Sequence, residues 1–151
     1  MVFNRQKDLK VSLPLTKRAV SFFLAKMKAK SRSVALYLVS QAEIKKIHKQ
    51  FFHDGTATDT ISFPFDPPSK AGFLGEVFVC PKTALEYAEK NRLNPLDETL
   101  LYILHGLLHL LGENDQTIQE KRTMQKKEKT SMKLLKDNLR GLSKRQLKAW
   151  L

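Results

Sequence analysis

The chain has 151 residues, with 27 Lys and Arg against 15 Asp and Glu, so its formal net charge is +12. Its length suits one ordinary domain, and an apolar content of 42% excludes a disordered basic tail. The single cysteine, Cys80, excludes an internal disulfide framework, and the charged first ten residues lack the apolar stretch of a signal peptide. We therefore expect one domain over residues 1–151 of a soluble, cytoplasmic protein with no membrane segment.

The positive charge gathers at both ends of the chain. Residues 1–33 carry a net charge of +8 and residues 117–151 carry another +8, whereas residues 34–116 carry −4. Basic ends of this kind attract polyanions, because the release of counterions favours binding to phosphates whatever their sequence. The alternative is a solvated Lys-rich surface, so charge alone favours a nucleic-acid partner only modestly.

Apolar spacing predicts the elements of the first part of the chain in order. A short strand is expected over residues 2–4, and a helix capped by Thr16 is expected over residues 16–28. The β-prone residues 34–39 predict a buried strand. A capping box at residues 40–43 then predicts the start of a second helix.

The rest of the chain predicts two strands and three helices: strands over residues 60–65 and 74–80, and helices over residues 81–91, 94–111 and 117–139. The helix over residues 94–111 is apolar on nearly all sides, which is typical of a central buried helix. The basic helical segment 117–151 belongs to the domain or extends it, with a short last turn at 143–151. The expected fold class is α+β, a mixed α/β arrangement in which helices pack a small mixed sheet of about four strands.

The central helix carries the residues with the clearest chemistry. His105 and His109 are one helical turn apart, so their imidazoles point to the same side. Gly112 can end the helix and let the chain fold back, which brings Asp115 toward the same point. Two imidazoles and a carboxylate can share one divalent metal ion, and three ligands leave a position open for water or substrate. The alternative is a pair of hydrogen-bonded core histidines.

This segment resembles the signature of the YbeY family of bacterial endoribonucleases, which are rRNA maturation factors. The family signature reads His-Gly-x-Leu-His-Leu-x-Gly-Tyr-Asp-His. The chain shares six of its positions, namely His105, Gly106, Leu108, His109, Leu110 and Gly112. Asp115 takes the place of the third histidine, where a carboxylate is an acceptable oxygen ligand.

Two upstream segments resemble the same family. The family sequence Pro-Thr-Asp-Val-Leu-Ser-Phe-Pro is matched by Thr58, Asp59, Ile61, Ser62, Phe63 and Pro64. The family sequence Leu-Gly-Asp-Ile-x-Ile corresponds to residues 74–79, with Glu76 in place of the aspartate. An arginine that the family carries upstream falls on Phe52 in this chain.

The resemblance implies a metal-dependent, single-strand-specific endoribonuclease, a hydrolase of phosphodiester bonds that acts in 16S rRNA 3′-end maturation and ribosome quality control. It implies one divalent metal ion, with zinc as the first candidate, bound by His105, His109 and Asp115. The two histidines would act in catalysis through the metal. The implied partners are rRNA and the small ribosomal subunit, with one of its ribosomal proteins and an assembly GTPase.

The resemblance also implies a cleft beside the metal, lined by Thr58, Asp59 and Ser62. Asp and Thr at the start of a strand equally often tie down a turn. The cation that would replace the family arginine against RNA is Lys45, Lys46, Lys49 or a lysine near one of the chain ends.

Other side chains near these motifs keep two interpretations. Glu76 either supports a metal-binding histidine or, as we slightly favour, points outward from its strand. The rings of Phe51, Phe52 and Phe63 either stack on RNA bases or, as we favour, fill the core, and the core is favoured most for Phe63. We expect His48 on the surface of its helix and His53 in a loop within reach of the cleft.

Two other functions share part of the pattern. A non-catalytic RNA-binding factor for ribosome assembly would explain the missing arginine and the altered third ligand. A zinc metalloprotease shares the ligand spacing, but it requires a glutamate after the first histidine, where this chain has Gly106.

Overall fold

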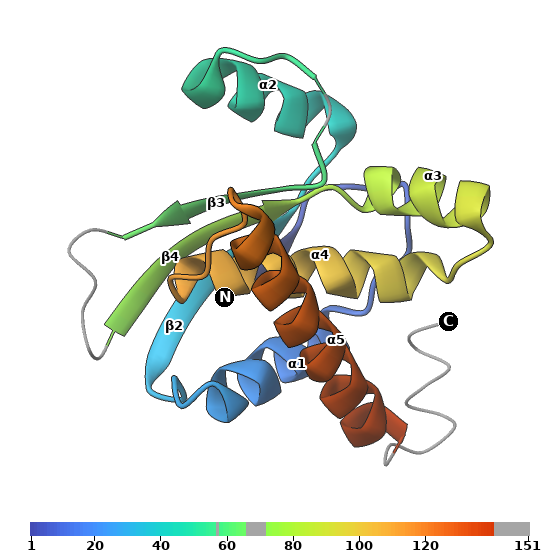
Figure 1. The fold of residues 1–151 in the computed structure, drawn as a ribbon. Helices are drawn as coiled ribbons and strands as arrows, with labels where there is room; N and C mark the ends of the chain where they lie inside the picture. Colours follow the sequence, from blue (N-terminus) through green and yellow to red (C-terminus); the bar gives the residue numbers. More distant parts are fainter. Residues whose placement is uncertain (57, 66–71, 141–151) are drawn as a thin grey trace.

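A computed structural model describes residues 1–56, 58–65 and 72–140. The elements in chain order are β1 (Val2–Asn4), α1 (Leu13–Lys26), β2 (Arg32–Leu38), α2 (Gln41–Phe52), β3 (Thr60–Pro64), β4 (Gly72–Val79), α3 (Pro81–Asn91), α4 (Pro95–Leu110) and α5 (Ile118–Arg140) (Figure 1). None of the described helices is long and apolar enough to cross a membrane.

The four described strands form one mixed sheet in the order β1-β2-β4-β3. β1, β2 and β4 are parallel, and β3 runs antiparallel along the outer edge of β4. In this register Ser62 of β3 lies opposite Val77 of β4, and Val77 lies opposite Leu36 of β2. The predicted α+β class, with a small mixed sheet packed by helices, is confirmed.

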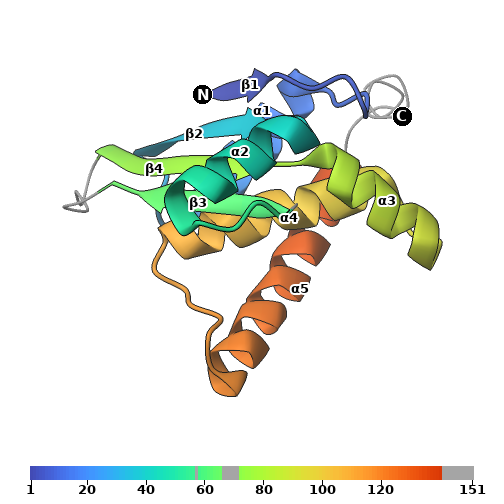
Figure 2. The ribbon, with the colours of Figure 1, turned by 90° about the horizontal axis from the view of Figure 1, so that it is seen from above.

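Helices cover both faces of this sheet. α2 lies over one face, and α1 and α4 lie against the other (Figures 1 and 2). α5 packs on the outside of α4 and α1. The larger apolar core fills the α4 face and includes Leu36, Val77 and Leu104, and a smaller one around Ile44 fills the α2 face. The central helix is therefore buried, as its apolar sequence predicts.

Two predicted helix boundaries have different outcomes. α1 begins at Leu13, so the prediction that Thr16 caps it is wrong. Pro14 fits the first turn of a helix, and the Thr16 hydroxyl, inside the helix, donates to the Ser12 carbonyl at 2.8 Å. The Ser40 cap of α2 is confirmed, because its Oγ accepts from the Glu43 amide at 3.2 Å. The expected last turn at 143–151 lies outside the described residues.

Candidate metal centre

The position of α4 against the sheet depends on Gly106. A Cβ at this residue would lie 2.4 Å from Val77 Cγ1 and 3.1 Å from the hydroxyl oxygens of Ser62 and Thr60. Real Cβ atoms do not come that close, so only glycine permits this contact. The Ser62 hydroxyl donates to the Gly106 carbonyl at 3.0 Å and fixes the helix beside β3. A glutamate here would point into the sheet, so the protease alternative has no room for its general base.

The return of the chain after α4 follows the predicted glycine turn. Gly112 has a φ of +96°, and its amide donates to the His109 carbonyl at 3.0 Å. The Glu113 amide reaches back to the Leu108 carbonyl at 3.0 Å, which completes a Schellman motif. The segment after this motif then passes in front of the two histidines, which brings Asp115 to them.

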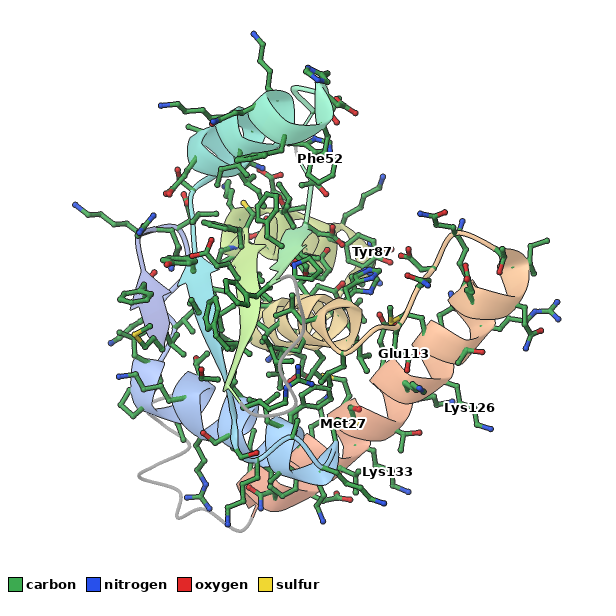
Figure 3. All side chains as sticks on the ribbon, turned by 90° about the vertical axis from the view of Figure 1, so that its left-hand side faces the viewer. Met27, Phe52, Tyr87, Glu113, Lys126 and Lys133 are labelled. Atoms are coloured by element: carbon green, nitrogen blue, oxygen red, sulfur yellow. The ribbon has the colours of Figure 1, made fainter. Side chains whose placement is uncertain are left out.

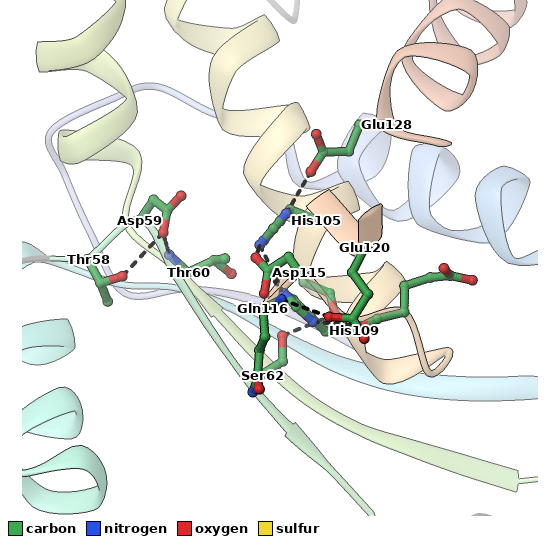
Figure 4. Close-up of polar contacts among 12 residues, drawn as sticks. Thr58, Asp59, Thr60, Ser62, His105, His109, Asp115, Gln116, Glu120 and Glu128 are labelled. Carbon is green, nitrogen blue, oxygen red and sulfur yellow. Dashed lines mark hydrogen bonds and ion pairs between the residues drawn. The ribbon is translucent and has the colours of Figure 1, made fainter. Parts of the chain in front are cut away.

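Three potential metal-binding atoms converge at this point. His105 Nε2 and His109 Nε2 are 3.0 Å apart, and Asp115 Oδ2 lies 3.5 Å from the first and 3.6 Å from the second (Figure 4). Ligands at the usual zinc distances of about 2.0–2.1 Å in a tetrahedral arrangement are about 3.3 Å from one another. The spacing of the three atoms therefore fits one small divalent ion, and the group can hold a metal.

Both imidazoles are held by their other ring nitrogen. His105 Nδ1 donates to Glu128 Oε1 of α5 at 2.6 Å, and His109 Nδ1 donates to the Glu113 carbonyl at 2.9 Å. A neutral imidazole with a proton on Nδ1 leaves Nε2 as a free electron pair. Two such pairs facing each other at 3.0 Å need a shared cation, either a proton or a metal ion.

The surroundings of His105 are acidic. The hydrogen bond to Glu128 raises the pKa of His105 against the opposing effect of burial, and the charges of Glu128, Asp59 and Asp115 add to the increase. Asp59, one residue before β3, thus acts on the histidine through its charge. This negative field favours a bound cation of any kind.

The group opens into a cleft of about 470 Å³ along the edge strand β3, with α4 on one side and α2 on the other. Its lining residues are His48, Phe52, Thr58, Thr60, Ile61, Ser62, Pro64, His105, His109, Asn114 and Gln116. The α4 side supplies the histidines, and α2 supplies the opposite wall. Phe52 is 53% exposed there, although its ring lies near His48 and Phe63.

The residues predicted around the cleft divide into two groups. Thr58 and Ser62 do line it. Asp59 does not, because its carboxylate accepts from the Thr58 hydroxyl at 3.2 Å and the Thr60 amide at 2.8 Å, the local role that Asp often has in turns. The cations Lys45, Lys46 and Lys49 are exposed on α2 and are likewise absent from the lining of this cleft.

Glu76 lies on the opposite side of the sheet from the histidines. Its carboxylate accepts from the Tyr37 hydroxyl at 3.1 Å, on the face that α2 covers. The outward orientation that the alternation favoured is therefore the one observed. The carboxylate that supports a histidine is Glu128, which the sequence analysis missed. It is one of several charges on a Lys-rich helix, and no local pattern distinguishes it.

The structure places His48, rather than His53, at the cleft. It lines the cleft, where its Nδ1 contacts the Thr56 carbonyl at 3.1 Å, whereas His53 ends α2 outside the cleft. The spacing of His48 and Phe52 on one helical face is the signal that joins them.

Comparisons with known proteins agree on one family. The family model described as "Endoribonuclease YbeY" matches residues 1–136. A curated protein named Endoribonuclease YbeY from Protochlamydia amoebophila is 46% identical over 114 residues, which are 74% of this chain and 76% of the relative. A protein of the same name from Chlamydia trachomatis serovar L2 is 36% identical over 141 residues, covering 91% and 88% of the two chains.

A solved structure shares the fold as well. The solution structure of TM1509 from Thermotoga maritima aligns with a TM-score of 0.67 at 25% identity. The alignment covers 93% of this chain and 92% of that protein.

Proposed function

This chain belongs to the endoribonuclease YbeY family, and we propose that it is a metal-dependent endoribonuclease specific for single-stranded RNA. The family supports a hydrolase that acts on RNA. The observation that carries the finer proposal is the convergence of two histidine Nε2 atoms and one carboxylate oxygen in an open cleft.

The metal in this proposal is a single divalent ion, with zinc as the first candidate. Its ligands are His105, His109 and Asp115, whose donor set of two imidazoles and one carboxylate suits zinc. Bound there, the ion would supply Lewis-acid stabilisation of the charge that develops on a phosphate during cleavage. Glu128 and the Glu113 carbonyl hold the two imidazoles with their Nε2 atoms turned toward the cleft.

The opposite wall supports the preference for single strands. Phe51 and Phe52 are 56% and 53% exposed at the end of α2, and Phe52 lines the cleft that the histidines share. An unpaired base can stack on such a ring, whereas a base inside a duplex cannot. The family arginine would offer charge at this position, so this chain uses an aromatic contact instead.

We propose rRNA of the small ribosomal subunit as the substrate, in the cytoplasm. The basic termini support it, since residues 1–33 and 117–151 each carry a net charge of +8. Contacts with a ribosomal protein and an assembly GTPase belong to the same proposal. The second candidate is a non-catalytic RNA-binding assembly factor, which the missing arginine favours.

One pair of measurements tests the function. Metal is quantified by elemental analysis in natively purified protein, and cleavage of single-stranded and duplex RNA is followed with and without a chelator. We expect about one metal ion per chain and chelator-sensitive cleavage of the single strand. RNA binding without metal or cleavage would instead favour the assembly factor.

A matched pair of variants assigns the metal to its ligands. His105→Ala removes one of the three converging atoms, and His53→Ala removes an exposed histidine outside the cleft. We expect His105→Ala to lose both metal and cleavage while keeping its circular dichroism spectrum, and His53→Ala to match the wild type. A folded His105→Ala protein with bound metal and full cleavage contradicts the proposal.

A further inference from the structure

A second concave surface lies between the end of α1 and the first half of α5. It encloses about 520 Å³, and we call it the α1–α5 groove. Its lining residues are Met27, Gln119, Arg122, Thr123, Lys126, Lys127, Thr130 and Ser131. Figure 3 shows Met27 and Lys126 below Glu113, and Phe52 of the cleft above it.

The groove has the chemistry of an anion site. Its charged lining residues are all cations, Arg122, Lys126 and Lys127. Lys127 pairs with the Glu113 carboxylate, but within the described part of the chain Arg122 and Lys126 have no ion-pair partner. Two cations without acidic partners therefore face the same concave surface.

Ser131 adds an unsatisfied hydrogen-bond donor. It is 2% exposed, and its hydroxyl has no hydrogen-bond partner among the described residues. Thr123 and Thr130 bond instead to the carbonyls one turn earlier, at 3.0 and 2.9 Å, as hydroxyls inside helices commonly do. A buried polar group without a partner is costly, so a ligand in the groove that reached the Ser131 hydroxyl would remove this cost.

A neighbouring pocket extends the groove. It encloses about 480 Å³ and shares Met27 and Lys127 with the groove, while Lys28 and Arg32 add further positive charge. Arg32 Nε is the second buried side-chain atom without a hydrogen-bond partner in the described chain. Together the charged lining residues of the two pockets are five cations and Glu113, which pairs with Lys127.

We propose that the α1–α5 groove is a second RNA-binding site, which holds the phosphodiester backbone of a part of the substrate outside the cleft. The proposal rests on the proposed function for its ligand. Guanidinium, ammonium and hydroxyl donors recognise phosphate oxygens, and the groove lining contains no aromatic ring on which a base could stack. The groove therefore contributes affinity without sequence preference.

Glu113 contacts a residue of the groove and a residue of the metal centre. The Glu113 carbonyl accepts from His109 Nδ1, and the Glu113 carboxylate pairs with Lys127 of the groove. α5 links the two sites again, since Glu128 contacts His105 while Lys126 and Lys127 line the groove. One RNA can thus contact both sites, with its flanking backbone in the groove and its unpaired strand in the cleft.

The test compares two charge-matched double variants. Arg122→Gln/Lys126→Gln removes the two groove cations without an ion-pair partner, and Lys90→Gln/Arg92→Gln removes two exposed cations outside the groove and the basic termini. Binding of a long structured rRNA fragment is measured by fluorescence anisotropy over a range of salt concentrations. Cleavage of a short single-stranded oligonucleotide, which fills only the cleft, is measured in parallel.

We expect the groove variant to bind the long RNA about tenfold more weakly near 0.1 M salt. The plot of log affinity against log salt concentration should also be less steep, by the amount expected for the loss of about two phosphate contacts. The control should lose far less, and all proteins should cleave the short oligonucleotide equally. Equal losses in both double variants, or no loss in either, overturn the proposal. If the wild type binds with this groove-dependent slope but cleaves nothing, the groove stands and the proposed function fails.

Ser131→Ala is the second variant. Because the hydroxyl has no partner, its removal should leave the melting temperature unchanged or higher, and we expect binding of the long RNA to weaken severalfold. Unchanged RNA affinity in this variant would show that Ser131 is not part of the proposed site, and it would count against the proposal.

Discussion

The two walls of the cleft are built in opposite ways. On the α4 wall each histidine has a second hydrogen bond, and Gly106 holds the helix against the strands. On the α2 wall Phe52 is exposed with its ring near those of His48 and Phe63, while His48 makes one hydrogen bond to a loop carbonyl. Under the proposed function, the α4 wall is the fixed side for chemistry and the α2 wall is the adaptable side for substrate, and four predictions test this assignment.

The largest effect is expected for Gly106→Ala. The added Cβ cannot remain 2.4 Å from Val77 Cγ1, so α4 must move away from β4 and carry both histidines with it. We expect a loss of stability of about 1–3 kcal/mol and a loss of cleavage of about a hundredfold or more. Urea unfolding and single-turnover cleavage measure the two effects. Gly55→Ala is the control, because its Cβ would have room, and wild-type cleavage by Gly106→Ala would contradict a rigid α4 wall.

A smaller effect is expected when the brace on His105 is removed. Glu128→Ala deletes the carboxylate that accepts from His105 Nδ1, so the imidazole loses its fixed orientation. We expect metal affinity to fall by about 10–100-fold with little change in the far-ultraviolet spectrum. Competition with a chromophoric chelator measures the affinity. Glu89→Ala, at an exposed glutamate of α3, should bind metal as the wild type does, and an equal affinity in Glu128→Ala would argue against the brace.

On the α2 wall the change concerns substrate rather than metal. Phe52→Leu removes the exposed ring at the cleft, and we expect KM for single-stranded RNA to rise about five- to tenfold with kcat nearly unchanged. Phe52→Tyr should restore the wild-type KM, because it restores a ring. Phe65→Leu is the control at a comparably exposed ring outside the cleft. A fall in kcat without a change in KM would mean that this wall also serves the chemistry.

The smallest effect concerns Glu98, which lies on the same face of α4 as the histidines. Burial raises its pKa, partly opposed by its hydrogen bond with Tyr102, and the charges of Asp59, Asp97 and Glu128 add to the increase. When folding raises the pKa of a carboxyl group, the folded protein loses stability as the pH rises from the ordinary pKa of that group through its raised pKa.

Glu98→Gln should therefore be more stable than the wild type at about pH 8, by less than about 1 kcal/mol, and the difference should shrink toward about pH 4.5. Thermal unfolding at a series of pH values checks this sign. Metal content should not change, because Glu98 is outside the converging group. A difference that grows as the pH falls would show that the ionised carboxylate stabilises the fold.

Local relations explain what could be predicted from the sequence. The common face of His105 and His109 follows from helix geometry, and the turn at Gly112 follows from its backbone freedom, so the converging group could be anticipated. The contact of Glu128 with His105 spans 23 residues and depends on how α5 crosses α4. Tertiary packing of this kind leaves no periodic signal in the sequence. His48 shares a helical face with Phe52, but that spacing alone does not say that the face borders the cleft.

The position of Glu128 on α5 has a consequence for the behaviour of the whole helix. Whatever cation binds between the histidines favours the state in which His105 is held, and that state exists only while α5 is docked on α4. By linkage, loading the metal centre and docking the helix strengthen each other by the same free energy. Much of α5 lies more than ten residues along the chain from the nearest proposed ligand. Its backbone amides should nevertheless exchange more slowly with deuterium when the ion is bound.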